Sequence, residues 1–451
     1  MEPRESAQAG AVSSERLSVQ PGDGMPVEQM STQSAAVSAS ATAADTRAPF
    51  ASIDGVTPAV FHALPTPCYL LDEAQLQANA EILGALAERT GCRILLAQKA
   101  FSNYDLYPIL APEFQNIKTP CYILDEKALV KNAKLLGEVS ERTGCKMLLA
   151  QKAFSNYDCY RFFEPYLAGT EASGLFEARL GAEEMPGKEV HVFCAAYREE
   201  EMTELIRYAD HIVFNSPAQL LCFGTQAKAA GKSLGLRINP EHSTQDGHAI
   251  YDPCAPGSRL GTTRAQWDAA VAAHPELPQL LDGLHFHTLC EQDADALSET
   301  LDAVAEKFGD LLPKLKWLNF GGGHHITRPG YDIALLEQCI RRAQDAWGVT
   351  VYLEPGEACA LNAGYLLTHV LDVVKNGDMT IVILDASAAC HMPDVIEMPY
   401  RPPLLHAGDA GEKSCTVRLA GPTCLAGDVI GDYSFDAEPK IGDLLVFGDM
   451  A

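Results

Sequence analysis

The feature that most constrains the fold is a regular alternation of short apolar runs and amphipathic segments after residue 145. Apolar runs of this length predict buried parallel strands, and parallel strands need helical crossovers between them. Eight strands are predicted, at Lys146–Gln151, Gly169–Ala172, Glu189–Cys194, His211–Asn215, Ser233–Asn239, Leu281–Thr288, Trp317–Gly322 and Thr350–Glu354. Helices are predicted between them at Leu175–Glu184, Glu199–Ala209, Pro217–Ala230, Arg264–Ala273, Asp293–Phe308 and Asp332–Trp347. This α/β pattern fits a (β/α)8 TIM barrel.

The segments on either side of the barrel differ from it in composition. Residues 1–50 are rich in Ser, Ala, Gln and Thr, which predicts a disordered N-terminal tail. Beyond Gly356, strand-like runs follow one another without intervening helices, so we expect a smaller, mainly β domain over residues 359–451. The barrel is then expected over residues 118–358, and its first short strand, 121–124, can also join the β domain.

Part of the chain is written twice. Leu95–Asp105 is repeated almost unchanged as Leu148–Asp158, and each copy ends a predicted βαβ unit on a lysine, Lys99 or Lys152. A closed barrel has room for only one first strand, and only the second copy runs on into the remaining strands. We therefore expect residues 51–117 to be a surplus copy of the N-terminal βαβ unit or an error in the assembled gene, with exchange of the two units as a further alternative.

Composition excludes several classes of function. The formal net charge is −26, from 34 basic and 60 acidic residues, which argues against binding nucleic acid and permits a cationic ligand. The 14 cysteines form no CxxC or zinc-type pattern, which favours reduced thiols in the cytoplasm. No apolar run approaches the ~20 residues that span a bilayer, so we expect no membrane association.

Polar residues follow the predicted strands, where barrels collect their chemistry. Lys152 comes after an apolar run; it is either a surface amine on a long apolar stem or a desolvated amine suited to Schiff-base chemistry. His285 and His287 lie on one face of a strand, either as hydrogen-bonded core residues or as functional groups. A metal is not expected, because no carboxylate or cysteine lies at ligand spacing from them.

The last two strands end in a glycine run and a carboxylate. Gly321, Gly322 and Gly323 either close their backbone N–H groups on a phosphate or form a simple flexible turn. Glu354 either pairs with a protonated ring nitrogen or is a buried structural carboxylate. Together with a strand-end lysine and a histidine that stacks on a ring, these groups indicate a site for pyridoxal 5′-phosphate.

Two motifs carry a resemblance to a known family. Asn-Phe-Gly-Gly-Gly-His-His-Ile-Thr at 319–327 and Gly-Pro-Thr-Cys-Leu-Ala-Gly-Asp at 421–428 resemble those of the fold type III pyridoxal phosphate enzymes, which include alanine racemase and the ornithine and diaminopimelate decarboxylases. The resemblance covers residues 118–451 and is strongest to the carboxynorspermidine decarboxylases. It implies an alanine racemase-like fold, with a cofactor-binding barrel and a C-terminal β domain.

The resemblance also implies roles for particular residues. Lys152 would bind the cofactor covalently and act in catalysis. His287 would stack on the cofactor ring and would also act in catalysis. Glu354 would pair with the ring nitrogen. Further cofactor contacts are implied for Glu171, Arg237, Gly321, Gly322 and Gly323.

Four more residues are implied to meet the substrate. Cys424 and Asp428 match loop residues that reach into the neighbouring subunit's site, so a homodimer is expected. There Cys424 would lie near the reacting carbon and Asp428 would point toward a distal amine of the substrate. The alternative for Cys424 is a buried apolar thiol. His324 is also expected to bind substrate. Glu357 stands where ornithine and diaminopimelate decarboxylases usually have arginine, and an acid there suits a long polycation.

The resemblance therefore implies decarboxylation of carboxynorspermidine or carboxyspermidine to norspermidine or spermidine, in polyamine biosynthesis. Diaminopimelate or ornithine decarboxylation is one alternative, and a non-catalytic protein that binds pyridoxal phosphate is another. In relatives, Gly-Asp-Met-Ala is followed by a segment whose tyrosine contacts the cofactor phosphate, whereas this sequence ends at Ala451. We accordingly expect a truncated β domain and reduced or absent activity for the chain as written.

Overall fold

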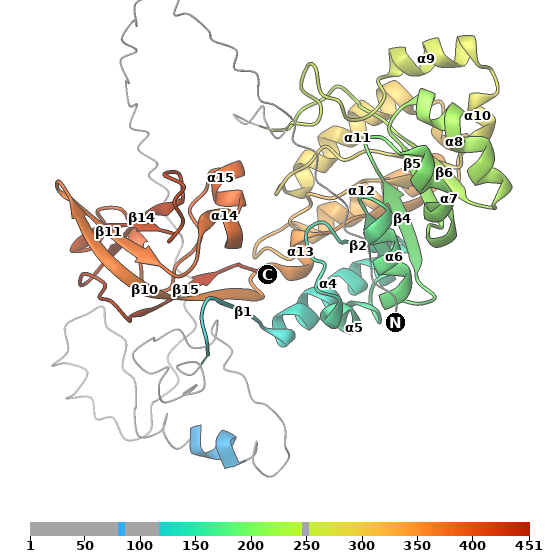
Figure 1. Cartoon of the computed structure of the whole chain (residues 1–451). Helices are drawn as coiled ribbons and strands as arrows, with labels where there is room; N and C mark the ends of the chain where they lie inside the picture. Colours follow the sequence, from blue (N-terminus) through green and yellow to red (C-terminus); the bar gives the residue numbers. More distant parts are fainter. Residues whose placement is uncertain (1–79, 86–116, 246–251) are drawn as a thin grey trace, which may run out of the picture. The chain divides into compact units, whose positions relative to one another are not determined.

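The computed structural model describes residues 80–85, 117–245 and 252–451, all of which belong to one compact unit that begins at Asp72 (Figure 1). The expected disordered tail, 1–50, lies outside the described residues. So does the surplus unit, 51–117, apart from residue 117 and the helical residues 80–85, and Lys99 lies outside with it. The domain boundaries given above stay predictions.

Eight parallel strands close into a barrel, as the alternation predicts. Each strand ends at or up to three residues before its predicted end. The seam of the barrel lies where β2 pairs with β9, with Lys146 opposite Tyr352. The strands are β2 (Lys146–Ala150), β3 (Gly169–Ala172), β4 (Glu189–Phe193), β5 (His211–Phe214), β6 (Ser233–Arg237), β7 (Gly283–His285), β8 (Trp317–Asn319) and β9 (Thr350–Leu353).

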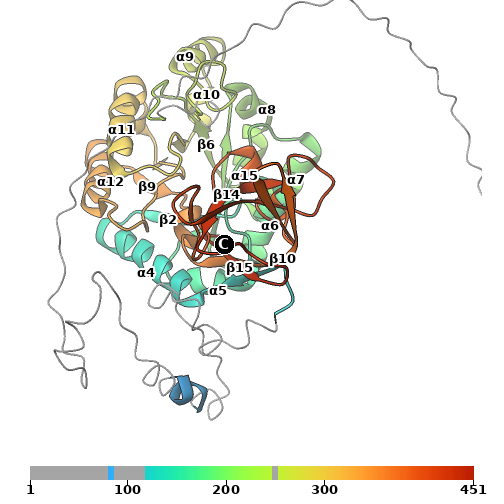
Figure 2. The ribbon, with the colours of Figure 1, turned by 90° about the vertical axis from the view of Figure 1, so that its left-hand side faces the viewer.

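Helices surround the strands of the barrel (Figure 2). The six predicted helices are all present, and each bound agrees with its prediction to within one residue. The barrel helices are α4 (Glu126–Thr143), α5 (Tyr160–Phe163), α6 (Leu175–Glu184), α7 (Glu199–Tyr208), α8 (Pro217–Ala229), α9 (Arg264–Ala273), α10 (Leu277–Leu280), α11 (Ala294–Phe308), α12 (Ile333–Trp347) and α13 (Glu357–Ala360). Asp125 caps α4 by accepting from Lys127 N and Ala128 N, which explains where that helix begins.

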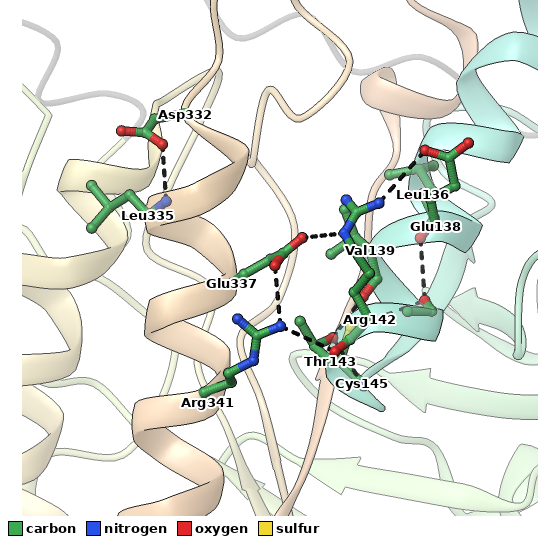
Figure 3. A network of polar contacts seen from close by, with 11 residues as sticks. Leu136, Glu138, Val139, Arg142, Thr143, Cys145, Asp332, Leu335, Glu337 and Arg341 are labelled. Atoms are coloured by element: carbon green, nitrogen blue, oxygen red, sulfur yellow. Dashed lines mark hydrogen bonds and ion pairs between the residues drawn. The ribbon is translucent and has the colours of Figure 1, made fainter.

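A network of charged groups joins the two helices beside the seam (Figure 3). Glu337 on α12 accepts from Arg142 Nε on α4 at 2.5 Å and from Arg341 Nη2 at 3.2 Å. Arg341 also donates to the Arg142 carbonyl at 3.1 Å. Burial alone would raise the pKa of Glu337, but the two arginines outweigh it and lower that pKa. Since α4 leads into β2 and α12 into β9, the network stabilises the closure of the barrel.

The C-terminal residues form a mainly antiparallel sheet with its own apolar core (Figure 1). Its strand order is β1-β10-β11-β13-β14-β12, and β15 also pairs with β10. The strands are β1 (Cys121–Leu124), β10 (Gly364–Asn376), β11 (Met379–Leu384), β12 (Gly408–Asp409), β13 (Cys415–Ala420), β14 (Val429–Phe435) and β15 (Leu444–Gly448). The expectation of strands without helices was wrong, because α14 (Ala388–His391) and α15 (Asp394–Glu397) follow β11. The sequence predicts strands here at 365–374, 380–384, 414–419 and 444–447, which correspond to β10, β11, β13 and β15; β12 and β14 were not predicted.

The barrel and the sheet are joined by direct contacts. β1 pairs with β10 in the sheet, and the chain then enters the barrel through α4. At this junction Asp125 N donates to Ala363 O at 2.7 Å. Asn132 Nδ2 donates to Cys359 O at 3.2 Å and to Leu361 O at 3.0 Å, so a buried amide ties α4 to the segment that leaves the barrel.

The described residues can be examined for membrane-spanning helices and for disulfides. Within residues 80–85, 117–245 and 252–451, no helix has both the length and the apolar character required to cross a membrane. The cysteines in the described part of the chain are all free thiols.

Substitution of Gly283 tests the packing of the barrel interior. A Cβ at this position would lie 2.0 Å from Trp317 Cδ2, in a buried layer without space to receive it. We expect Gly283→Ala to lower the free energy of unfolding by about 1–3 kcal/mol, measured by urea denaturation. Combined with Trp317→Leu, which makes space, it should cost less than the sum of the two single changes. Gly427→Ala, where nothing lies within 4 Å, is the control, and equal costs at both glycines would contradict this account of the packing.

Candidate active site

The carboxyl ends of the barrel strands bring the predicted site residues together. Glu171 lies in β3, Arg237 ends β6, and Glu354 directly follows β9. The charges of Glu354, Lys152 and Arg237 all act on the pKa of Glu171, so these groups share one electrostatic environment. The charges of Lys152 and Arg237 also act on the pKa of His287. Residues up to 202 positions apart in the sequence, Lys152 and Glu354, thus form one site because the barrel closes.

Lys152 lies in a turn, two residues beyond the end of β2. Its side chain is exposed, so the hypothesis of a desolvated amine is wrong. The residues before it are buried: Gln151 donates from its backbone N to Glu171 O at 3.0 Å, which holds the start of the turn against β3. The amine is therefore accessible, on a short turn anchored beside a buried carboxylate.

Glu354 is a buried carboxylate with two hydrogen-bond donors. Asn319 Nδ2 donates to its Oε1 at 2.7 Å, and His285 Nε2 lies 3.2 Å from its Oε2. Burial raises the pKa of Glu354, but His285 and Lys152 outweigh that effect and lower it to about 2. His285 is itself buried, which lowers the pKa of its ring, so it donates as a neutral imidazole. Glu354 is thus ionised at neutral pH.

Glu171 is a second buried carboxylate in the opposite protonation state. Glu171 is 3% exposed, and its Oε2 has no hydrogen-bond partner among the described residues. Burial, with a further contribution from the charge of Glu354, raises its pKa to about 8. One carboxylate is therefore ionised at neutral pH while the other carries a proton, and the free oxygen of Glu171 is available to a ligand.

His287 is half-buried and held by its backbone. Arg237 Nη2 donates to the His287 carbonyl at 3.0 Å, and the Arg237 guanidinium stacks over Phe193 at 4.5 Å from the ring centroid. Burial lowers the pKa of Arg237 to about 10. Burial, and then the nearby charges of Lys152 and Arg237, lower the pKa of His287 well below its usual value. Its ring is therefore neutral, as stacking on another flat ring requires.

The three glycines after β8 pass directly over His287 and Glu354. Gly321 and Gly323 have positive φ angles of 71° and 79°. A Cβ at Gly321 would lie 2.6 Å from His287 Cβ, and one at Gly322 would lie 2.7 Å from Glu354 O. Only glycine fits here, which favours a built loop over a simple flexible turn.

These residues fit pyridoxal phosphate. Glu354 is ionised and positioned to hold a protonated ring nitrogen, the neutral His287 can stack, and the glycine loop offers backbone N–H groups to a phosphate. An exposed lysine beside them can bind the cofactor covalently. The reasoning against a metal was wrong in one respect: a carboxylate does lie near His285 and His287, because Glu354 arrives from another strand and the ligand atoms lie within 4.8 Å of one another.

The C-terminal loop residues are described within a single chain. Cys424 is exposed, so the alternative of a buried apolar thiol is wrong. Asp428 is buried and accepts four hydrogen bonds inside its own domain, from Ser387 Oγ at 3.0 Å, Ala388 N at 2.8 Å, and Thr423 N and Oγ1 at 3.3 and 2.6 Å. The carboxylate of Asp428 thus holds the loop that carries Cys424. The contact of Asp428 with a distal amine of the substrate stays a prediction.

The structure separates the two adjacent histidines. His324 is buried, its Nε2 lies 3.4 Å from Phe320 O, and burial lowers its pKa to about 4, so its contact with substrate stays a prediction. His325, which the sequence analysis did not select, has its Nε2 3.0 Å from Glu357 Oε1. The contacts of Asn319 and His285 with Glu354 were also not predicted, although Asn319 and His325 lie in the motif at 319–327 quoted above.

Comparison with known proteins supports this interpretation of the site. A family model described as "Pyridoxal-dependent decarboxylase, C-terminal sheet domain" matches residues 53–451. The chain is 43% identical to the carboxynorspermidine/carboxyspermidine decarboxylase of Campylobacter jejuni, over 74% of this chain and 88% of that protein. It is 39% identical to the carboxyaminopropylagmatine decarboxylase of Synechocystis, over 75% and 86%.

Solved structures agree with the fold. The crystal structure of carboxynorspermidine decarboxylase from Campylobacter jejuni, in complex with norspermidine, matches with a TM-score of 0.67 and 42% identity, over 74% of this chain and 88% of that one. Diaminopimelate decarboxylase from Helicobacter pylori matches with a TM-score of 0.63 at 20% identity, over 77% and 88%.

The fold and the site define an enzyme that uses pyridoxal phosphate in a barrel of the alanine racemase type. The chain belongs to the family of pyridoxal-dependent decarboxylases. The predicted fold, cofactor and class of enzyme are confirmed.

The raised pKa of Glu171 predicts an effect on stability. Its folded pKa of about 8 lies above the ~4.3 of an unfolded glutamate, so the unfolded chain releases a proton that the folded chain keeps. Between these pH values Glu171 lowers stability, and the loss grows as the pH rises. We expect Glu171→Gln, without added cofactor, to equal the wild type near pH 4 and to exceed its stability increasingly toward pH 8.

Urea denaturation across this pH range measures the difference. Glu183→Gln, at an exposed position on α6, is the matched control and should show no such trend. A difference between Glu171→Gln and the wild type that stays constant with pH would disprove the raised pKa.

Proposed function

We propose that the chain decarboxylates a carboxylated polyamine, carboxynorspermidine or carboxyspermidine, and so forms norspermidine or spermidine. The observation that carries the proposal is Glu357, an acid where ornithine and diaminopimelate decarboxylases usually have arginine. Its side chain is 41% exposed and accepts from His325 at 3.0 Å, so its free oxygen can meet a cationic ligand. The hydrogen bond to Glu357 raises the pKa of His325.

Other acidic groups near Glu357 support a cationic substrate. Burial raises the pKa of Glu291, and the charges of Glu357, Asp449 and Asp394 raise it further. Burial raises the pKa of Asp449, and the charge of Glu357 raises it further. The hydrogen bond that Asn362 N donates to Asp449 lowers this pKa but does not outweigh the other two effects. Carboxylates that repel one another in this way are stabilised by a ligand that carries several positive charges.

A cavity of ≈ 470 Å³ lies beside the segment that follows the lysine turn. Its lining includes Ser155 and Asn156 from that segment together with Asp394 and Asp449. We propose that the amine arm of the substrate lies along these carboxylates while its carboxylated end lies near Lys152.

Within the site we propose the following division of work. Bound pyridoxal phosphate supplies an electron sink for the pair left when CO₂ departs. Glu354 keeps the ring nitrogen protonated, since its own pKa is about 2, and His287 stacks on the ring. Arg237 positions His287 through its carbonyl. Gly321, Gly322 and Gly323 would hold the phosphate, and Lys152 would bind the cofactor covalently.

The relatives agree with this choice of substrate. Proteins named carboxynorspermidine/carboxyspermidine decarboxylase are 43% and 35% identical to the chain, whereas those named diaminopimelate decarboxylase are 24–26% identical. The 39% identity to a carboxyaminopropylagmatine decarboxylase favours that related cation as a second candidate. We further propose a homodimer, in which Cys424 of one subunit acts near the reacting carbon of the other, and a location in the cytoplasm.

A panel of substrates tests the proposal. Carboxynorspermidine, carboxyspermidine, carboxyaminopropylagmatine, diaminopimelate and ornithine are compared by CO₂ release from the cofactor-loaded chain. We expect the highest kcat/KM with carboxynorspermidine or carboxyspermidine, because the acidic groups match their charges. A preference for diaminopimelate or ornithine would contradict the proposed choice of substrate. Cofactor binding without turnover of any compound in the panel would favour a non-catalytic protein.

Glu357 should control the choice among these compounds. We expect Glu357→Gln to weaken the binding of norspermidine about tenfold, or ~1.4 kcal/mol, measured by calorimetry, because a charge-assisted contact is lost. The binding of lysine, the short product of diaminopimelate, should not weaken. Glu138→Gln, at an exposed position on α4, is the control. Equal loss for both ligands would place the effect of Glu357 on the fold and not on the polyamine arm.

The cofactor lysine can be identified chemically. Borohydride reduces the covalent link between cofactor and lysine to a stable amine, and peptide mapping then finds the labelled residue. We expect the label on Lys152, because its turn continues from β2 of the closed barrel. Lys152→Ala should remove the label and Lys99→Ala should not. Label mainly on Lys99 would show that the other copy of the unit forms the barrel.

A further inference from the structure

Gln151 is a polar residue at the end of an apolar run. It follows Leu148, Leu149 and Ala150 and directly precedes Lys152. Gln151 is 1% exposed, and burial of an amide costs free energy unless its polar groups form hydrogen bonds. The division of work proposed above gives this side chain no part, so its partners must show what it does.

The amide of Gln151 forms hydrogen bonds with three other elements of the barrel. Its Nε2 donates to Glu177 O on α6 at 2.8 Å and to Glu171 O on β3 at 3.4 Å. Its Oε1 accepts from Tyr160 Oη on α5 at 3.1 Å. The backbone N of Gln151 also donates to Glu171 O, at 3.0 Å. Gln151 therefore joins the end of β2 to β3, α5 and α6.

Glutamine is the side chain that these partners require. Two of the partners are carbonyl oxygens, which need a donor, and the third is a hydroxyl that donates. An amide offers both kinds of group without a charge, whereas a carboxylate cannot donate and an ammonium cannot accept. Gly181 on α6 leaves space for this amide, since a Cβ there would lie 3.3 Å from Gln151 Nε2 and 2.2 Å from Thr170 Oγ1.

The turn that carries Lys152 is anchored at both of its ends. Gln151 is the first residue of this turn, which covers residues 151–153, and Phe154 directly follows it. Phe154 is 4% exposed and packs edge-on against Phe163, with ring centroids 5.7 Å apart. Lys152 and Ala153, which lie between the two anchors, are exposed. A polar anchor and an apolar anchor thus fix the backbone from which the lysine side chain extends.

We infer that Gln151 is a positioning residue for the covalent link between Lys152 and pyridoxal phosphate. This role rests on the proposed function of Lys152 as the cofactor lysine. An exposed lysine side chain is flexible, so its amine meets the cofactor efficiently only when its backbone is held in place. A displacement of about 1 Å at a reacting group can cost about a hundredfold in rate. Through Glu171 O, Gln151 also holds the turn at a fixed distance from the buried carboxylate of Glu171.

The alternative is that Gln151 stabilises the fold and nothing more. Loss of its amide would then lower stability but leave the reactivity of Lys152 unchanged in the molecules that remain folded. Asn132 on α4 provides the comparison, because it is a second buried amide that also donates to two carbonyl oxygens. Its partners are Cys359 O at 3.2 Å and Leu361 O at 3.0 Å, and neither belongs to the lysine turn.

Two measurements on the full chain separate these roles. The chain is freed of cofactor and mixed with pyridoxal phosphate, and visible absorbance follows the rate at which the covalent link forms. Visible circular dichroism per bound cofactor then reports how firmly the ring is held. We expect Gln151→Met to slow the link about tenfold and to reduce this dichroism. Asn132→Leu should match the wild type in both measurements. Tyr160→Phe, which removes one partner of Gln151, should slow the link about threefold.

Far-ultraviolet circular dichroism at the same temperature checks that each variant is folded. Wild-type values in folded Gln151→Met, or equal losses in Asn132→Leu, would overturn the positioning role of Gln151. Should Gln151→Met not fold, a wild-type rate in folded Tyr160→Phe would overturn it instead.

Borohydride labelling distinguishes the failure of this role from the failure of the proposed function. Label on a lysine other than Lys152 would contradict the proposed function. Label on Lys152, with the rate and the dichroism of Gln151→Met unchanged, would contradict only the role of Gln151.

Discussion

The chemistry of this protein depends on a carboxylate that stays ionised inside a barrel. Glu354 is 3% exposed, where an isolated charge costs several kcal/mol, and it persists because Asn319 and His285 donate to its two oxygens. Both donors come from the ends of the two preceding strands, β8 and β7. The charge that a pyridine nitrogen needs is therefore a property of three adjacent strands held in register.

That fixed charge also determines its surroundings. Glu171, on the far side of the seam, keeps its proton to a pKa of about 8, first because it is buried and then because the charge of Glu354 acts on it. The same closure brings Lys152 next to both carboxylates, since β2 pairs with β3 on one side and β9 on the other. The network of Glu337 and its arginines on the outside of this seam thus supports the site, although it lies far from the chemistry.

Much of the architecture could be predicted from the sequence, because alternation of apolar runs reports burial directly. The strand-end residues Lys152, His287 and Glu354 followed from it, since parallel strands deliver their ends to one face. Contacts between distant segments could not be predicted: the partners of Glu354 and the pairing of His325 with Glu357 depend on loop conformation. The sequence left open whether Lys152 is a surface amine or a desolvated one; it is exposed because it lies in a turn past the strand, where apolar neighbours in sequence no longer enclose it.

The interior of the barrel also explains how one small fold can hold two polar clusters, the active site and a group around Glu189 at the opposite mouth. On β4, Glu189, His191 and Phe193 point inward in succession, from the mouth opposite the active site toward it. Phe193 stacks on His285, with centroids 5.4 Å apart, and so forms part of the floor under Glu354. Between the clusters lies a layer that includes the buried Leu148 and Val213. Because this layer excludes water, each cluster must satisfy its own charges: Glu189 does so with Lys146, and Glu354 with Asn319 and His285.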